Sequence, residues 1–160
     1  MLRILSKHPQ ALAFALLGYS LVIFQGAAVA EESTVVTLTQ TACQFIESEG
    51  NVERGYRSQS AADCEAINAR TAAQRLADAV PLKLKPGRYV FQVTNRDVPY
   101  ELGFWLRPAR LVDRVLLPSV SGGGLVTGKS QAYAIELKPG EYLYSCPLNP
   151  TPNYRLIVEG

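Results

Sequence analysis

Apolar and polar residues alternate along most of the chain after Pro81, which is the pattern of strands that bury one face. The clearest case is the segment 88–95, where Tyr89, Phe91 and Val93 fall on the same side. The segment 34–39 is rich in β-branched residues and is predicted to be the first strand. The other predicted strands are 82–85, 100–106, 115–117, 131–137, 141–145 and 154–158, and the glycine-rich segment 121–128 is predicted to be a loop.

One segment has helical spacing instead. Residues 60–79 are rich in alanine, arginine and glutamine and contain no glycine or proline, and Ser58 or Ser60 is available as an N-terminal cap. Two Pro-Gly pairs, at 86–87 and 139–140, predict type II turns between strands. The pattern therefore predicts a mainly β fold, a Greek-key β-sandwich with one inserted helix at about 60–79.

The first 30 residues have the composition of a secretory signal peptide. Arg3 and Lys7 precede an apolar stretch of 14 residues at 11–24, and Ala28-Val29-Ala30 supplies the small residues of a cleavage site. The alternative is an uncleaved membrane anchor, but a spanning helix needs ~20 apolar residues. We therefore expect cleavage after Ala30 and a mature domain over 31–160. That domain is predicted to be periplasmic or secreted, with no membrane span after cleavage.

The charge of the expected mature chain is balanced. Two of the 16 basic residues lie in the predicted signal peptide, so 14 remain against 14 acidic residues. This balance gives no electrostatic reason to expect nucleic acid or an anionic membrane as a partner. Arg107, Arg110 and Arg114 lie close to Asp113 after a predicted strand. We expect a solvated loop there, with a patch for an acidic partner as the alternative.

Three segments of the chain resemble the cupredoxin family, which includes plastocyanin and azurin-like proteins. They are 84–95, 95–102 and 140–149. The resemblance implies a cupredoxin-like β-sandwich over most of the chain from Leu84 onward, together with the first strand. It also places the family's copper ligands on particular positions: the two histidines on Tyr100 and Asn149, the cysteine on Cys146, and the axial methionine near Asn153 or Tyr154.

Only the cysteine of that ligand set is retained. A blue-copper site needs two imidazoles and a thiolate, with a weak axial ligand. The chain has one histidine, His8, and one methionine, Met1, and both lie in the predicted signal peptide. The mature domain is therefore predicted to have no type 1 copper site. Without histidine it also lacks the usual base for nucleophilic or acid–base catalysis, so we do not expect an enzyme.

The three cysteines divide into a pair and a remainder. Export permits disulfides, and a Cys43–Cys64 bridge is predicted to tie the helix to the sandwich. The bridge would close a loop of about 20 residues, which is worth roughly 3 kcal/mol of stability in the chain-entropy model. Cys146 is then unpaired. It is either a thiol available for Cu(I) or oxidation, or an inert side chain buried at the end of a core strand.

The segment 123–130 matches the phosphate-loop pattern G-x-x-x-x-G-K-S. That loop works only where a helix follows and directs its N-terminus at the phosphates. The next residues alternate as a strand, so we interpret the match as accidental.

These observations predict an exported, non-enzymatic binding or accessory domain without a cofactor. The candidate interaction surface comprises Tyr100, Trp105, Cys146, Asn149 and Tyr154, and the partner is a protein or a small molecule. The alternative is a copper-binding or electron-transfer protein that uses Cys146 as a metal ligand, with atypical or partner-supplied ligands.

Overall fold

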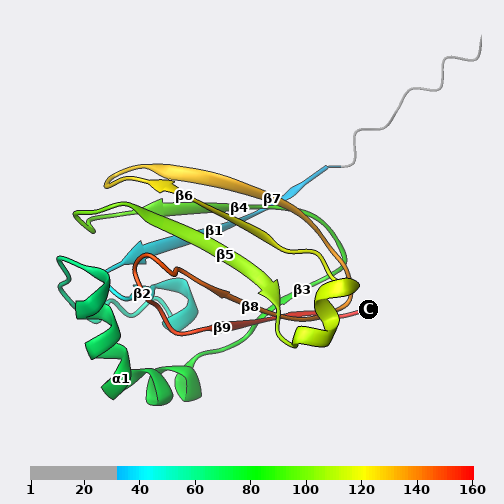
Figure 1. Ribbon diagram of the computed structural model, residues 1–160. Coiled ribbons are helices and arrows are strands. Elements are labelled where there is room, and N and C mark those ends of the chain that lie inside the picture. The colour runs from blue at the N-terminus through cyan, green and yellow to red at the C-terminus, as the bar shows by residue number, and fades with distance from the viewer. Residues whose placement is uncertain (1–31) are drawn as a thin grey trace, which may run out of the picture. The chain divides into compact units, whose positions relative to one another are not determined.

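The computed structural model describes residues 32–160, and the predicted signal peptide lies outside them (Figure 1). In this part of the chain two mixed β-sheets face each other, and residues 31–160 form a unit with its own core. Within the same residues no helix has both the length and the apolar character needed to cross a lipid bilayer.

The first sheet is built around the parallel pair of β1 and β4. Thr34 of β1 lies opposite Tyr89 of β4, and Gln40 lies opposite Asn95. The neighbours on either side, β2 and β7, are antiparallel to this pair. The strand order is β2 (Gln44–Phe45), β1 (Thr34–Thr41), β4 (Gly87–Asn95) and β7 (Ser130–Leu137).

The second sheet contains the chain's last strand in an interior position. The order is β3 (Leu82–Leu84), β9 (Tyr154–Val158), β8 (Gly140–Ser145), β5 (Leu102–Pro108) and β6 (Val120–Leu125). β3 and β9 are parallel and the other pairs are antiparallel. The connections pass from one sheet to the other, as in a Greek-key sandwich, so the predicted β-sandwich with one inserted helix is confirmed.

Aromatic side chains fill the space between the sheets. Phe45 lies at the centre of one cluster, with its ring centroid 6.1 Å from Phe104, 5.6 Å from Tyr144 and 6.0 Å from Tyr154, all edge to face. Each such pair adds about 0.5–1.5 kcal/mol beyond area burial. The short strand β2 therefore contributes a fully buried ring that ties the hairpin of β1 and β2 to the second sheet.

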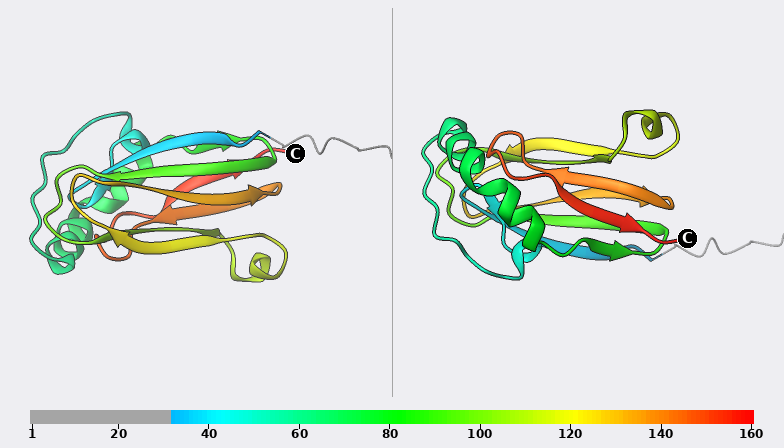
Figure 2. Two further views of the ribbon diagram at one scale, coloured as in Figure 1. Left: turned by 90° about the horizontal axis from the view of Figure 1, so that it is seen from above. Right: turned by 90° about the horizontal axis from the view of Figure 1, so that it is seen from below.

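The inserted helix α1 (Ala61–Asp78) confirms the prediction at 60–79. The carboxylate of Asp63 accepts the backbone N–H of Ser60 at 3.0 Å and caps the first turn. Figures 1 and 2 show α1 beside β9, outside the two sheets. The segment 43–59, between β1 and this helix, also contains β2 and the short 3-10 helix η1 (Glu47–Glu49).

The glycine-rich segment 121–128 is not a loop, which corrects the sequence prediction. Most of it belongs to β6, which pairs with β5 at the edge of the second sheet. A Cβ placed on Gly103 would lie 2.6 Å from the carbonyl oxygen of Gly122, so this close approach of two strands requires glycine. The strand β7 begins at Ser130, so no helix follows the segment 123–130, as a phosphate loop would need.

The predicted strand at 115–117 is also wrong. The chain forms a 3-10 helix, η2 (Leu111–Val115), and the N–H of Leu117 donates to the carbonyl oxygen of Asp113 at 2.8 Å. An ion pair between Arg110, which is largely exposed, and Asp113, at 2.8 Å, adds a small stabilisation to this local turn.

The two Pro-Gly corners differ from the predicted type II turns. Gly87 and Gly140 have φ of 149° and 155°, compared with about +80° in a type II turn. Glycine is still required, because side chains rarely adopt such positive angles.

Candidate functional site

Three of the predicted site residues meet at one end of the sandwich. Cys146 directly follows β8, Asn149 lies in the connection from β8 to β9, and Tyr100 precedes β5. The Asn149 N–H donates to Cys146 Sγ at 3.2 Å, and the Tyr100 hydroxyl lies 3.1 Å from Asn149 Oδ1. Three of the four positions that the resemblance assigns to copper ligands are therefore neighbours in space.

Cys146 is held as a buried thiol. Its side chain is 1% exposed, and besides the Asn149 N–H its sulfur accepts the N–H of Gly103 at 3.3 Å. Burial raises the pKa of the thiol above its ordinary value, although these backbone hydrogen bonds act in the opposite direction. The side chain is therefore not set up as a reactive thiolate, which favours the interpretation of an inert core cysteine.

Asn149 is fully buried and uses both ends of its amide. Its Oδ1 accepts the N–H of Cys43 at 3.0 Å as well as facing Tyr100, and its Nδ2 donates to the carbonyl oxygen of Thr41 at 3.0 Å. Cys64 Sγ also lies 3.0 Å from Oδ1, a contact without a proton because this sulfur is in a disulfide. The amide thus joins the β8–β9 connection to the end of β1.

The predicted disulfide closes this group from the helix side. Cys43 and Cys64 are bridged, with 5.0 Å between their Cα atoms, which confirms that prediction. The Tyr100 hydroxyl lies 2.9 Å from Ser58 Oγ and 3.2 Å from the carbonyl oxygen of Ser60, beside the start of α1. We call Tyr100, Cys146, Asn149 and the disulfide the closed end.

The donor set of the closed end differs from that of a blue-copper site. Its donors are one buried thiol, one phenol and one amide already engaged at both ends, with no imidazole or thioether. Among residues 32–160, no three side chains of His, Cys, Asp and Glu come together as possible metal ligands. What occupies the ligand positions is a set of hydrogen bonds that holds three loops together.

Trp105 and Tyr154 lie away from this group. Tyr154 is 1% exposed, and its hydroxyl donates to Glu49 Oε1. Trp105 is partly exposed on β5, with the guanidinium of Arg107 4.1 Å from its ring centroid. Of the five residues predicted for an interaction surface, Cys146, Asn149 and Tyr154 are buried, so only Tyr100 and Trp105 offer surface to a partner.

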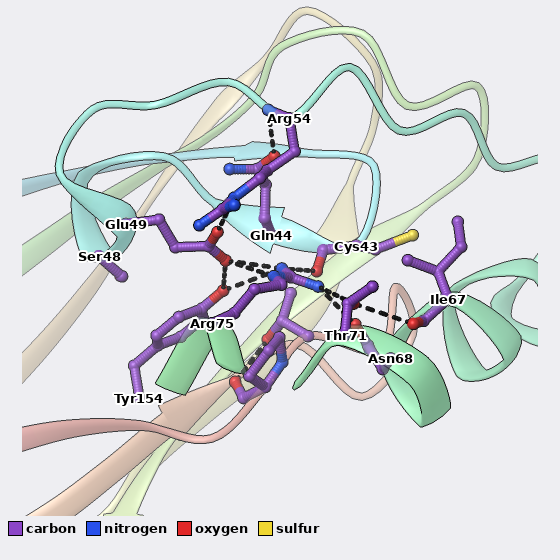
Figure 3. Close-up of polar contacts among 12 residues, drawn as sticks. Cys43, Gln44, Ser48, Glu49, Arg54, Ile67, Asn68, Thr71, Arg75 and Tyr154 are labelled. Carbon is purple, nitrogen blue, oxygen red and sulfur yellow. Dashed lines mark hydrogen bonds and ion pairs between the residues drawn. The ribbon is translucent and has the colours of Figure 1, made fainter. Parts of the chain in front are cut away.

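A buried ion pair beside Tyr154 was not predicted from the sequence (Figure 3). Arg75 of α1 donates to Glu49 Oε1 through Nε at 2.9 Å and through Nη2 at 2.6 Å, and Nη2 also donates to the carbonyl oxygen of Cys43 at 2.8 Å. Burial raises the pKa of Glu49, but hydrogen bonds from Arg75, Tyr154 and Arg54 outweigh it and leave the pKa lowered. The pair fixes α1 to η1 and β9.

The only sequence signal for this cluster is an arginine inside an alanine-rich helix. Because Glu49 precedes Arg75 by 26 positions and Tyr154 by 105, no local pattern relates the three residues.

A polar groove of about 340 Å³ opens beside the closed end. One wall is the segment 55–59 with Tyr56, Arg57 and Ser58, and the other is the segment 97–99 with Asp97. Ser58 contacts Tyr100, so the groove adjoins the closed end directly.

No protein-family model matches the chain, and no curated protein matches its sequence. One solved structure that overlaps it is that of Fet3p, described as a multicopper oxidase that functions in iron import. The two share 11% identity over 92% of this chain and 37% of that protein, with a TM-score of 0.41. This chain therefore spans little more than a third of that protein, and a likeness of this extent says nothing about what the chain binds.

Proposed function

We propose that residues 31–160 form an exported, non-enzymatic, cupredoxin-like binding or accessory domain without a type 1 copper site. The observation that carries this proposal is the state of Asn149. Its amide takes the place that the resemblance assigns to a histidine, and it is saturated by Thr41, Cys43 and Tyr100. A side chain committed to three structural partners is not free to bind a metal.

A non-enzymatic role is supported by the chemistry left at the closed end. Residues 31–160 contain no histidine, and the pKa of Cys146 is raised by burial, so the thiol has neither a base nor access to substrate. Export is supported by the signal-like N-terminal sequence together with the Cys43–Cys64 disulfide.

The binding role is assigned to the polar groove beside the closed end. Its walls carry Arg57 on one side and Asp97 on the other, so charges of both signs can orient a polar ligand or a segment of a partner protein. The disulfide and Asn149 hold the loops beneath it, which lowers the ordering cost of binding.

Titration with copper tests this proposal. Purified Glu31–Gly160 is loaded with Cu(II), and separately with Cu(I) under reducing conditions, and the bound metal and visible spectrum are recorded for the native chain and Cys146→Ser. We expect no stoichiometric copper and no intense blue band in either protein. Stoichiometric copper that is lost in Cys146→Ser would refute the proposal.

A second candidate is copper binding or electron transfer through Cys146 with atypical or partner-supplied ligands, and the same titration tests the form that uses ligands of this domain alone. It is favoured by one observation, the two backbone N–H groups of Gly103 and Asn149 directed at Sγ. Hydrogen bonds of this kind tune a copper-bound cysteine sulfur.

A further inference from the structure

The end of the sandwich opposite the closed end carries an exposed aliphatic surface. Four side chains in and next to η2 are between 72% and 88% exposed, although all are large and apolar. Exposed apolar clusters on a soluble domain generally mark an interaction site. The residues are Leu111, Val112, Val115 and Leu116, which together with Arg107, Arg110 and Arg114 we call the lobe.

The lobe is an ordered projection. Its backbone is closed by the hydrogen bond from Leu117 to Asp113, and the side chain of Leu117 turns inward against Gly140 of β8. The N–H of Ala109 donates to the carbonyl oxygen of Glu141 at 2.9 Å and ties the start of the lobe to the same strand. Figure 2 shows η2 as a short coil that projects beyond the strands. The aliphatic side chains therefore point outward from a fixed support.

Arginines concentrate positive charge at the base of the lobe. Arg107, Arg114, Trp105 and Ser119 line a pocket of about 140 Å³. Burial lowers the pKa of Arg107 and the nearby charge of Arg114 lowers it further, so the two cations repel each other. Among residues 32–160, Arg114 has no carboxylate partner, and a bound anion would relieve this repulsion.

The nearby acidic residues leave a positive excess. Asp113 is paired with Arg110, and Glu141 is paired with Arg155 at 3.3 Å. The segment 107–117 has three arginines and one aspartate, which gives a net charge of +2 in a domain that is neutral as a whole. The whole-chain balance thus conceals a local basic surface.

From these observations we propose that the lobe docks on an anionic phospholipid surface, with its aliphatic side chains at the boundary of headgroups and acyl chains and a lipid phosphate between Arg107 and Arg114. A projecting aliphatic tip with a basic rim matches the layered chemistry of a bilayer surface. The pocket supplies two guanidinium groups to the phosphate, and guanidinium is the preferred side-chain partner of that group.

Vesicle binding tests the proposal. Glu31–Gly160, which has its own core, is mixed with vesicles of phosphatidylcholine alone or with phosphatidylglycerol added, and the bound fraction is measured by sedimentation. Trp105 is the only tryptophan, and it lines the pocket, so quenching by brominated acyl chains reports contact at the lobe. We expect binding only to the anionic vesicles, with quenching of Trp105.

Matched variants identify the residues responsible. Arg107→Gln/Arg114→Gln should weaken binding about fivefold for each charge removed. Leu111→Ser/Val115→Ser should weaken it about tenfold or more. The controls are Val80→Ser, which is 79% exposed elsewhere, and Arg96→Gln, which is exposed near the closed end, and both should bind as the native domain does.

Each remaining outcome overturns the proposal. No binding to anionic vesicles, equal binding to neutral vesicles, or binding that survives both double variants would do so. Inorganic phosphate that binds the pocket without vesicle binding would assign the arginines to a soluble anion. A dimer seen by light scattering and lost in Leu111→Ser/Val115→Ser would assign the lobe to a second copy of the chain.

Discussion

The two ends of the sandwich differ in what they bury: polar groups are buried at the closed end, and apolar groups are exposed at the lobe. At the closed end, Asn149 and Cys146 are buried and every hydrogen-bonding atom of the Asn149 amide has a partner. At the lobe, which lies at the other end of β5 and β8, aliphatic side chains such as Val115 stand in solvent. The first arrangement stabilises the fold. The second exposes apolar surface to water, which is unfavourable, and adds few packing contacts.

This difference separates residues kept for stability from residues available for binding. Buried polar groups that lose a partner are penalised strongly, so the closed end tolerates little change. Replacing exposed aliphatic groups costs little stability, and our proposal assigns those of the lobe to binding. Substitutions at the closed end should therefore lower the stability of the domain, whereas substitutions in the lobe should weaken its binding and leave its stability nearly unchanged.

The largest effect is expected where the closed end is tied to α1. Arg75→Ala leaves Glu49 as a buried charge without its main partner, and the free energy of unfolding should fall by about 3–5 kcal/mol. Arg54→Ala is the matched control, because Arg54 binds the same carboxylate from a side chain that is 32% exposed. Its cost should be below about 1 kcal/mol in urea titrations. Equal losses in both variants would contradict this account.

Removing the disulfide should cause the second-largest loss of stability. Cys43→Ala/Cys64→Ala opens a link between residues 21 positions apart and should cost about 3 kcal/mol in thermal or urea unfolding. Reductant should lower the stability of the native domain and leave the double variant unchanged. A thiol assay on the unfolded, unreduced native chain should find one free thiol, that of Cys146. Three free thiols would show that the bridge does not form.

A smaller loss is expected from the amide at the centre of the closed end. Asn149→Ala leaves the N–H of Cys43 and the carbonyl oxygen of Thr41 without their partner, which should cost about 2 kcal/mol. Asn153→Ala is the control, because Asn153 is exposed and accepts one bond from Arg107. Chemical denaturation measures the free energy of unfolding of both variants. A larger loss in Asn153→Ala than in Asn149→Ala would contradict the contrast between the two ends.

The smallest change in stability is expected in the lobe. Leu111→Ser/Val115→Ser replaces side chains that are 73% and 88% exposed, and the free energy of unfolding should move by no more than about 0.5 kcal/mol per site. Calorimetry on the native and variant domains checks this. A large loss would mean that the lobe packs against the domain in solution and is not an outward-facing surface.

The sequence predicted the strands whose side chains alternate and failed where backbone contacts decide the structure. The pattern at 88–95 identifies β4, because Tyr89, Phe91 and Val93 face the core. β6 was missed because it contains three consecutive glycines, at 122–124, and glycine is normally depleted from strands. η2 was missed because local backbone hydrogen bonds, such as that from Leu117 to Asp113, close a turn that the strand preference of Val115 does not indicate.

The sequence predicted three residues of the candidate site, but it did not predict their surroundings. The resemblance places Tyr100, Cys146 and Asn149 together, and the two remaining cysteines form the predicted bridge. The burial of Asn149 depends on Thr41, Cys43 and α1, which come from a part of the chain more than 80 residues away. Such contacts between distant segments leave no periodic signal in the sequence.

The interior position of the last strand has a consequence for how the chain matures. β9 lies between β3 and β8, so the second sheet cannot close until residues 154–158 are available. A chain that emerges N-terminus first during synthesis or translocation leaves β3 and the β9-facing edge of β8 unpaired until residues 154–158 appear, although β8 can already pair with β5. Such long-range pairing is slow and leaves strand edges open to aggregation, so we expect the domain to be most prone to aggregation before β9 has joined the sheet.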